Sequence, residues 1–131
     1  MSIFGRRVPA RSVALVAMAL VVAALLPVMT KAPSREITLV ARGMTFYLDG
    51  DLNTANPTIH VDRGETVRVI LQNRDRGMTH DFSVPALGEA LDAVEWNESG
   101  DVIFDVPDRP GTYEYRCRPH GLMMRGILVV H

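Results

Sequence analysis

The sequence predicts an all-β sandwich or barrel, and two observations predict it. From Glu36 onward the chain carries eight short runs rich in β-branched and aromatic residues, separated by turn-forming residues at roughly ten-residue spacing. In residues 67–69 and 104–106 apolar side chains alternate with a charged one, as in a strand with one face on a core. The expected strands are residues 36–41, 44–48, 58–61, 66–72, 80–84, 101–106, 111–116 and 124–130.

The connections between these strands are rich in Gly, Pro, Asn and Asp, which agrees with the strand count. Only residues 86–96 suggest a helix, because Leu87, Leu91 and Val94 have helical spacing in a long connection. The chain has 131 residues, one domain's worth of sequence, and it shows no internal repeat and no second domain.

The first 32 residues predict a signal peptide or an N-terminal membrane anchor, followed by one domain over residues 33–131. Three arginines precede a nearly all-apolar stretch, residues 13–29. Its 17 residues are at the lower limit of a spanning helix, roughly 17 to 25, and exceed a signal-peptide core of roughly 7 to 15. The length favours an anchor over a cleaved signal, and Thr30-Lys31-Ala32 is a poor cleavage site.

The charges predict orientation and exclude one class of partner. Arg6, Arg7 and Arg11 should stay in the cytoplasm, which places the rest of the chain in the periplasm or another extracytoplasmic space. The pair Arg6-Arg7 is also weakly indicative of twin-arginine export. From Pro33 onward, 10 basic residues face 15 acidic ones, a net charge of −5, which argues against nucleic-acid binding.

The sharpest chemical signal is the segment Cys117-Arg118-Pro119-His120-Gly121-Leu122-Met123-Met124, between the last two expected strands. An exported domain with one cysteine cannot form an internal disulfide, so Cys117 is free, paired between chains, bound to something, or a small buried core residue. Thiolate, imidazole and thioether together suit copper better than zinc. A short loop cannot surround a metal alone, and His80, at the start of an expected strand, is the natural further ligand.

These motifs resemble the cupredoxin (blue-copper) family over roughly residues 36–131. The Cys-x-Pro-His run is similar to the plastocyanin and amicyanin loop, and the His-x-x-x-Met-basic-Gly ending is similar to azurin. The resemblance implies a Greek-key β-sandwich of about eight strands, preceded by one N-terminal hydrophobic helix. It also implies one mononuclear type 1 copper held by His80, Cys117, His120 and Met124, with Met123 as the alternative axial ligand.

The implied function is transport of single electrons between redox protein partners, with no small-molecule substrate and no enzymatic activity. Four histidines are too few for a multicopper oxidase, and one cysteine is too few for a dinuclear copper centre. The alternative is a periplasmic copper carrier or chaperone, or a copper-resistance protein, which would use the same ligands. The two functions differ in how the copper is held: a copper carrier should give it up to a chelator or partner, whereas an electron carrier should retain it.

Two positions depart from the family. Many members have asparagine after the first histidine and serine or threonine after the cysteine, whereas this chain has Asp81 and Arg118. In the familiar members these residues tie the ligand segments together by hydrogen bonds, so we hypothesise that an Asp81–Arg118 ion pair replaces that tie. The alternative is that both side chains face water.

The resemblance also makes the edge of His120 the expected electron port. The expected apolar patch around it comprises Met78, Pro85, Pro119, Leu122 and Met123, and Arg116, Arg118 and Arg125 would favour a partner with a negative docking face. Met44, Met78 and Met123 fill gaps in the core or collect copper(I). His60 and His131 are expected in exposed or structural roles.

Overall fold

The computed structural model describes residues 31–131, so nearly all of the expected export segment, including its hydrophobic helix, lies outside the described residues. The choice between signal peptide and anchor therefore stays a prediction. Among residues 31–131, no helix has the length and apolar character needed to cross a membrane.

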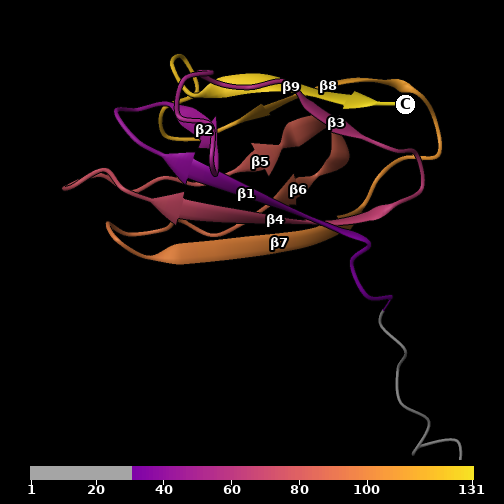
Figure 1. Ribbon diagram of the computed structural model, residues 1–131, viewed down its shortest axis with the longest axis horizontal. Coiled ribbons are helices and arrows are strands. Elements are labelled where there is room, and N and C mark those ends of the chain that lie inside the picture. Colours follow the sequence, from indigo (N-terminus) through magenta and orange to yellow (C-terminus); the bar gives the residue numbers. More distant parts are fainter. Residues whose placement is uncertain (1–30) are drawn as a thin grey trace, which may run out of the picture. The chain divides into compact units, whose positions relative to one another are not determined.

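Two β-sheets make up this part of the chain (Figure 1). One has the strand order β2-β1-β4-β7 and the other β3-β9-β8-β5-β6. Strands β1 and β4 pair in parallel, as do β3 and β9, and the other pairs are antiparallel. The strands are β1 Arg35–Ala41, β2 Phe46–Leu48, β3 Ile59–Val61, β4 Thr66–Asn73, β5 Ser83–Val84, β6 Glu89–Ala90, β7 Ser99–Asp105, β8 Gly111–Arg116 and β9 Arg125–Val130. The predicted all-β sandwich is confirmed.

The core lies between the two sheets and follows the alternation in the strands. In β4, Val67 and Val69 are buried, while Arg68 lies on the outer face between Glu36 and Asp101. Side chains from both sheets form one buried cluster, to which every strand except β6 contributes at least one apolar side chain.

An aromatic group fills the core near the end of the sandwich where β8 ends. Tyr115 stacks on Phe82, with ring centroids 5.4 Å apart, and meets Phe46 edge-on at 5.5 Å. Its buried hydroxyl donates a hydrogen bond to the Pro57 carbonyl at 2.6 Å. These contacts fix β8 just before Cys117.

The helix suggested for residues 86–96 is wrong. Only a short 3-10 helix, Pro85–Leu87, forms there, and Gly88 ends it in the left-handed conformation at φ 70°. Beyond it the chain is extended, because the Leu91 amide bonds to the Phe82 carbonyl and Val94 pairs with His80. Leu91 and Val94 are buried in this extended segment, so their spacing reflects burial against the core and not one face of a helix.

The strand expected over residues 80–84 is shorter than predicted, because only Ser83–Val84 forms β5. His80 is instead held by an isolated antiparallel bridge with Val94, through hydrogen bonds of 3.1 and 2.7 Å. At the same end of the sandwich, residues 117–124 connect β8 to β9. The fold thus brings the segment before β5 and the β8–β9 loop together.

Candidate metal centre

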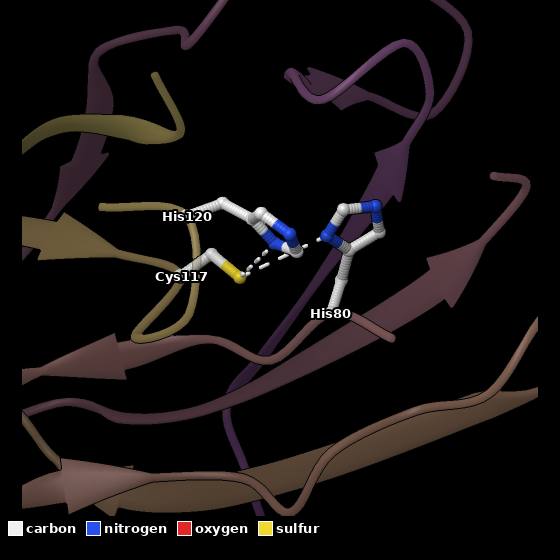
Figure 2. Close-up of side chains that lie close together, drawn as sticks. All are labelled: His80, Cys117 and His120. Carbon is white, nitrogen blue, oxygen red and sulfur yellow. Dashed lines mark hydrogen bonds between the residues drawn. The ribbon is translucent and has the colours of Figure 1, made fainter. Parts of the chain in front are cut away.

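His80, Cys117 and His120 meet at this end of the sandwich (Figure 2). The Cys117 sulfur lies 3.8 Å from His80 Nδ1 and 3.6 Å from His120 Nδ1. One ligand atom from each residue lies within 4.8 Å of the other two. Cys117 and His80 are fully buried, and His120 is partly exposed.

This spacing fits one metal ion. An ion about 2.3 Å from a thiolate and about 2.0 Å from an imidazole nitrogen, at a trigonal angle of about 120°, separates sulfur and nitrogen by about 3.7 Å, using bond lengths known for zinc. The two observed separations, 3.8 and 3.6 Å, bracket that value. Together with the thioether of Met124 in the same loop, the residues match a single type 1 copper site.

The loop geometry holds Cys117 in place. Its backbone amide donates to the Met124 carbonyl at 3.0 Å, which closes the loop, and the Asp81 amide donates to its sulfur at 3.5 Å. Burial raises the pKa of the Cys117 thiol, although the hydrogen bond from Asp81 opposes this. A metal bound at this sulfur would take the place of the thiol proton.

The two candidate axial methionines differ in burial. Met124 is fully buried in the core cluster, whereas Met123 is 58% exposed. The amides of both residues donate hydrogen bonds to the His120 carbonyl, so the chain turns tightly there although the two side chains differ in exposure. Burial therefore favours Met124 over Met123 as the residue that faces the site.

The hypothesised ion pair between Asp81 and Arg118 is confirmed. Arg118 Nε donates to Asp81 at 2.6 Å, and the Arg118 backbone amide donates to the other carboxylate oxygen at 2.7 Å. The Arg118 guanidinium also reaches the Leu91 carbonyl at 3.1 Å. Asp81 follows His80 and Arg118 follows Cys117, so the pair joins two ligand segments. The alternative, in which both side chains face water, is wrong because the Asp81 side chain is only 4% exposed.

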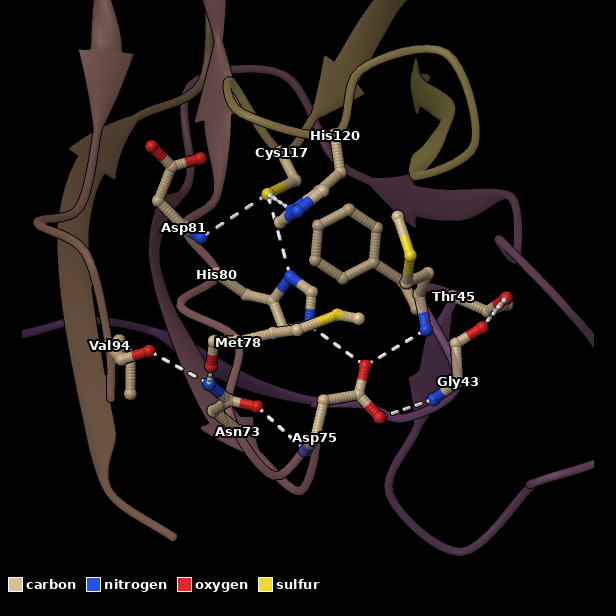
Figure 3. Close-up of polar contacts among 12 residues, drawn as sticks. Gly43, Thr45, Asn73, Asp75, Met78, His80, Asp81, Val94, Cys117 and His120 are labelled. Atoms are coloured by element: carbon tan, nitrogen blue, oxygen red, sulfur yellow. Dashed lines mark hydrogen bonds and ion pairs between the residues drawn. The ribbon is translucent and has the colours of Figure 1, made fainter. Parts of the chain in front are cut away.

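Asp75 is a site residue that the sequence analysis missed. Its carboxylate lies 2.8 Å from His80 Nε2, the ring nitrogen that faces away from Cys117 (Figure 3). Burial acts to raise the pKa of Asp75, but amide donors from Met44 and Gly43 and the contact with His80 outweigh it, so its pKa lies below the ordinary value. In the sequence, Asp75-Arg76-Gly77 has the composition of a turn, which gives no hint of a distant partner.

An apolar pocket surrounds the exposed edge of His120. It is lined by Met44, Pro119, His120, Gly121, Leu122 and Met123. Pro119, Leu122 and Met123 confirm part of the expected patch, whereas Met44 was not expected in it. Leu122 is 91% exposed and stands out from the loop.

Two residues of the expected patch lie outside this pocket, and the core role expected of two methionines needs correction. Pro85 begins the 3-10 helix after β5 and does not line the pocket, nor does Met78, which is 39% exposed. Met78 and Met123 do not fill the core, because both are exposed.

The other two histidines lie at exposed positions, as expected. His60 is in β3 and His131 follows β9, which pairs with β3. Their rings stack, and His60 Nδ1 lies 2.8 Å from His131 Nε2. They contact each other and do not join the His80–Cys117–His120 cluster.

Comparison with known proteins agrees with this geometry. Among solved structures, the chain is similar to auracyanin B, with 22% identity over 79% of this chain and 94% of that one and a TM-score of 0.61. It is similar to a rusticyanin variant, with 19% identity, coverage of 77% and 80%, and a TM-score of 0.59. It is also similar to a reduced Cu(I) form of amicyanin, with 28% identity, coverage of 77% and 86%, and a TM-score of 0.51.

A comparison with curated proteins found no match. The family model of the cupredoxin-like domain matches residues 14–130, which is most of the chain. The two-sheet fold and the cluster of two histidines and one cysteine agree with that match. The chain therefore belongs to the cupredoxin-like domain family.

Proposed function

We propose that this chain is an exported blue-copper protein that carries single electrons between redox partners. In this proposal His80, Cys117 and His120 bind copper in a trigonal set, and Met124 is the weak axial ligand. The observation that carries it is the convergence of the Cys117 sulfur and two Nδ1 atoms at 3.6 and 3.8 Å. Bound there, copper supplies a one-electron couple between its +1 and +2 states.

The protein keeps the ligands in one arrangement. His80 and Cys117 are fully buried, so solvent does not compete for the metal on their side of the site. The backbone of His80 is held by its bridge with Val94. The backbone around Cys117 is held by the hydrogen bond from the Cys117 amide to the Met124 carbonyl and by the one from the Arg118 amide to the Asp81 carboxylate. Because these contacts do not depend on the charge of the metal, the ligands need little rearrangement when an electron arrives or leaves.

His120 offers the route to a partner. It is the one partly exposed member of the histidine–cysteine cluster described here, and the pocket around it is apolar. A small apolar contact suits the weak, short-lived encounters of electron-transfer proteins, whose interfaces lie below about 1,200 Å². We therefore propose that donor and acceptor proteins dock over His120 and Leu122.

The charges near the loop bear on partner choice. Arg116 and Arg125 are exposed, but Arg116 lies 3.9 Å from Glu114, and Arg118 is held by Asp81. A partner with an acidic face would be steered chiefly by Arg125 and Arg116. Export, which removes the domain from the cytoplasm, rests on the arginines and apolar stretch of residues 1–32.

One observation favours a second candidate, a copper carrier. Met44 and Met123 line the pocket beside His120, and exposed thioethers could pass copper(I) to another protein. An electron carrier and a copper carrier differ in whether the metal leaves the site. The burial of His80 and Cys117 supports retention and hence the electron carrier.

Repeated redox cycling in the presence of a copper(I) chelator separates the two. The copper-loaded full chain is reduced with ascorbate and reoxidised with ferricyanide over many cycles, and bound copper is measured after each. An electron carrier retains its copper, both in the unchanged chain and in a Met44→Leu, Met123→Leu control. Loss of copper to the chelator within the first cycles, slowed in that double variant, would instead establish the carrier.

A further inference from the structure

His80 uses both of its ring nitrogens. Nδ1 lies 3.8 Å from the Cys117 sulfur, and Nε2 lies 2.8 Å from an Asp75 carboxylate oxygen (Figure 3). The ring is fully buried, so water does not supply a partner for either nitrogen. The environment of His80 is therefore set by one soft ligand atom on one side and one carboxylate on the other.

The Asp75 carboxylate is itself held from several directions. One oxygen accepts the Gly43 amide at 2.5 Å, and the other accepts the Met44 amide at 2.8 Å as well as facing His80. The Asp75 amide donates to the side chain of Asn73 at 2.8 Å. The position of the carboxylate is thus fixed by the β1–β2 turn and by the end of β4.

Asn73 extends this network to the backbone that carries His80. It is fully buried, and its side-chain amide donates to the carbonyls of Met78 at 2.7 Å and Val94 at 2.9 Å. Val94 is the residue that pairs with His80 in the isolated bridge. Asn73 and Asp75 therefore hold the His80 segment and the His80 ring together.

The chemistry of the acceptor determines the tautomer of His80. An ionised carboxylate can only accept hydrogen bonds, and it already accepts two from backbone amides. His80 Nε2 must then carry the proton and donate to Asp75, which leaves the Nδ1 lone pair free and directed toward Cys117. That is the form of the imidazole that can bind a metal through Nδ1.

The charge of Asp75 also reaches the site. The carboxylate side chain is only 13% exposed, so solvent screens it weakly. Among residues 31–131, no lysine or arginine lies within salt-bridge distance of Asp75, whereas Asp81 is neutralised by Arg118. Asp75 thus places an uncompensated negative charge behind a metal-binding imidazole.

We propose that Asp75 is a positioning residue that fixes the tautomer and orientation of His80 and biases the site toward copper(II), which lowers its reduction potential. This inference rests on the proposed copper site. A carboxylate behind a metal-bound histidine raises the basicity of the ligand, and removing such a partner costs about 10- to 100-fold in metal affinity. The doubly charged ion gains more from the carboxylate than the singly charged ion does.

The test compares the copper-loaded full chain with Asp75→Asn and with Asp108→Asn. Asparagine keeps the size of the side chain and one acceptor oxygen but removes the charge. Asp108 is an exposed carboxylate in the connection before β8, at the strand end opposite Cys117, so its variant changes the net charge equally. Copper(II) and copper(I) affinities are measured by competition, and reduction potentials by voltammetry.

In Asp75→Asn, copper(II) affinity should fall about 10- to 100-fold, while copper(I) affinity falls less. Each tenfold difference between the two raises the potential by about 59 mV for one electron. Asp108→Asn should leave both quantities unchanged. Equal potentials in the two variants would overturn the proposal.

A measurement on the unchanged, metal-free chain tests the inference even if Asp75→Asn fails to fold. Nitrogen NMR of the unchanged chain without metal should show His80 protonated at Nε2 and not at Nδ1. Protonation at Nδ1 would overturn the inference whatever the variants do. If instead the unchanged chain binds no copper but shows the Nε2 proton, the proposed function fails while the positioning role of Asp75 stands.

Discussion

At the scale of single residues, Met124 and Met123 are adjacent in the sequence and opposite in environment. We predict that Met124→Leu raises the reduction potential, on the order of 59 mV for a tenfold change in relative affinity, because losing an electron donor disfavours copper(II) more than copper(I). Leucine has nearly the same volume, so unfolding stability should fall by less than about 1.5 kcal/mol. Voltammetry and copper hyperfine splitting check this.

Met123→Leu is the matched control for that substitution. Its side chain is 58% exposed, so the variant should keep the potential and the spectrum of the unchanged chain. A changed spectrum in Met123→Leu with an unchanged one in Met124→Leu would assign the axial position to Met123.

The Asp81–Arg118 pair is a second prediction at this scale. In a double-mutant cycle with Asp81→Asn and Arg118→Ser, we expect a coupling of about 1 kcal/mol in unfolding free energy. The value is modest because the Arg118 side chain is 54% exposed, although Asp81 is buried. Chemical denaturation of all four metal-free chains measures it. Additive effects of the two substitutions would show that the pair does not join the ligand segments energetically.

At the scale of elements, Tyr115 secures β8 against the loop that contains Pro57. We predict that Tyr115→Phe lowers unfolding stability by about 1–2 kcal/mol, because the buried Pro57 carbonyl loses its donor. Burial raises the pKa of Tyr115 above its ordinary value of 10.0. Its stabilising contribution is therefore complete below pH 10 and declines as the pH rises beyond that value.

Denaturation of the metal-free chains between pH 8 and about 11 checks this prediction. The unchanged chain should lose stability above pH 10, and Tyr115→Phe should lose less over the same interval. Equal losses in the two chains would mean that other groups cause the alkaline destabilisation.

The elements also show what the sequence could predict. Strict alternation located β4, and turn residues on both sides located β8. The helix expected over residues 86–96 is wrong, because spacing alone cannot separate a helical face from an extended segment that pairs with the residues just before it in the chain. The expected strand over 80–84 is shorter because His80 pairs with Val94 in an isolated bridge, and only Ser83–Val84 pair with β6 and β8.

The site was predictable where its residues are close in sequence. Cys117 and His120 share one loop, the need for a further ligand from outside that loop indicated His80, and the family pattern added the glycine at 126. A side chain at Gly126 would collide with the Tyr115 ring, which gives that glycine a physical reason. Asp75 was not predictable, because it reaches the site through a turn whose composition reveals only the turn, and Met44 was expected in the core or as a copper(I) collector and not beside His120.

At the scale of the whole molecule, we propose that partners contact the end of the sandwich at which His120 lies. We predict that Leu122→Glu slows electron self-exchange between oxidised and reduced copies about tenfold, a barrier change of about 1.4 kcal/mol. Two copies that meet at this face would each bury an unpaired carboxylate where Leu122 now offers an exposed apolar side chain, and burying an unpaired charge costs free energy. NMR line broadening in mixed samples at low salt measures the rate.

Ile103→Glu provides the matched control for this variant. Ile103 is an exposed apolar residue in β7, 49% exposed and in the sheet that does not contain β8 and β9. Ile103→Glu should leave the self-exchange rate unchanged. Both variants should keep the unfolding free energy of the unchanged chain within about 0.5 kcal/mol. Equal slowing by the two substitutions would show that net charge, and not contact at Leu122, controls the rate.

The most direct test of the central claim is the visible and electron paramagnetic resonance spectrum of the copper(II)-loaded chain beside that of Cys117→Ser. We expect an intense blue band and narrow copper hyperfine splitting in the unchanged chain, both lost in the variant. A colourless or weakly coloured protein, with the spectrum unaffected by Cys117→Ser, would contradict a thiolate-bound type 1 copper and with it the electron-carrier function.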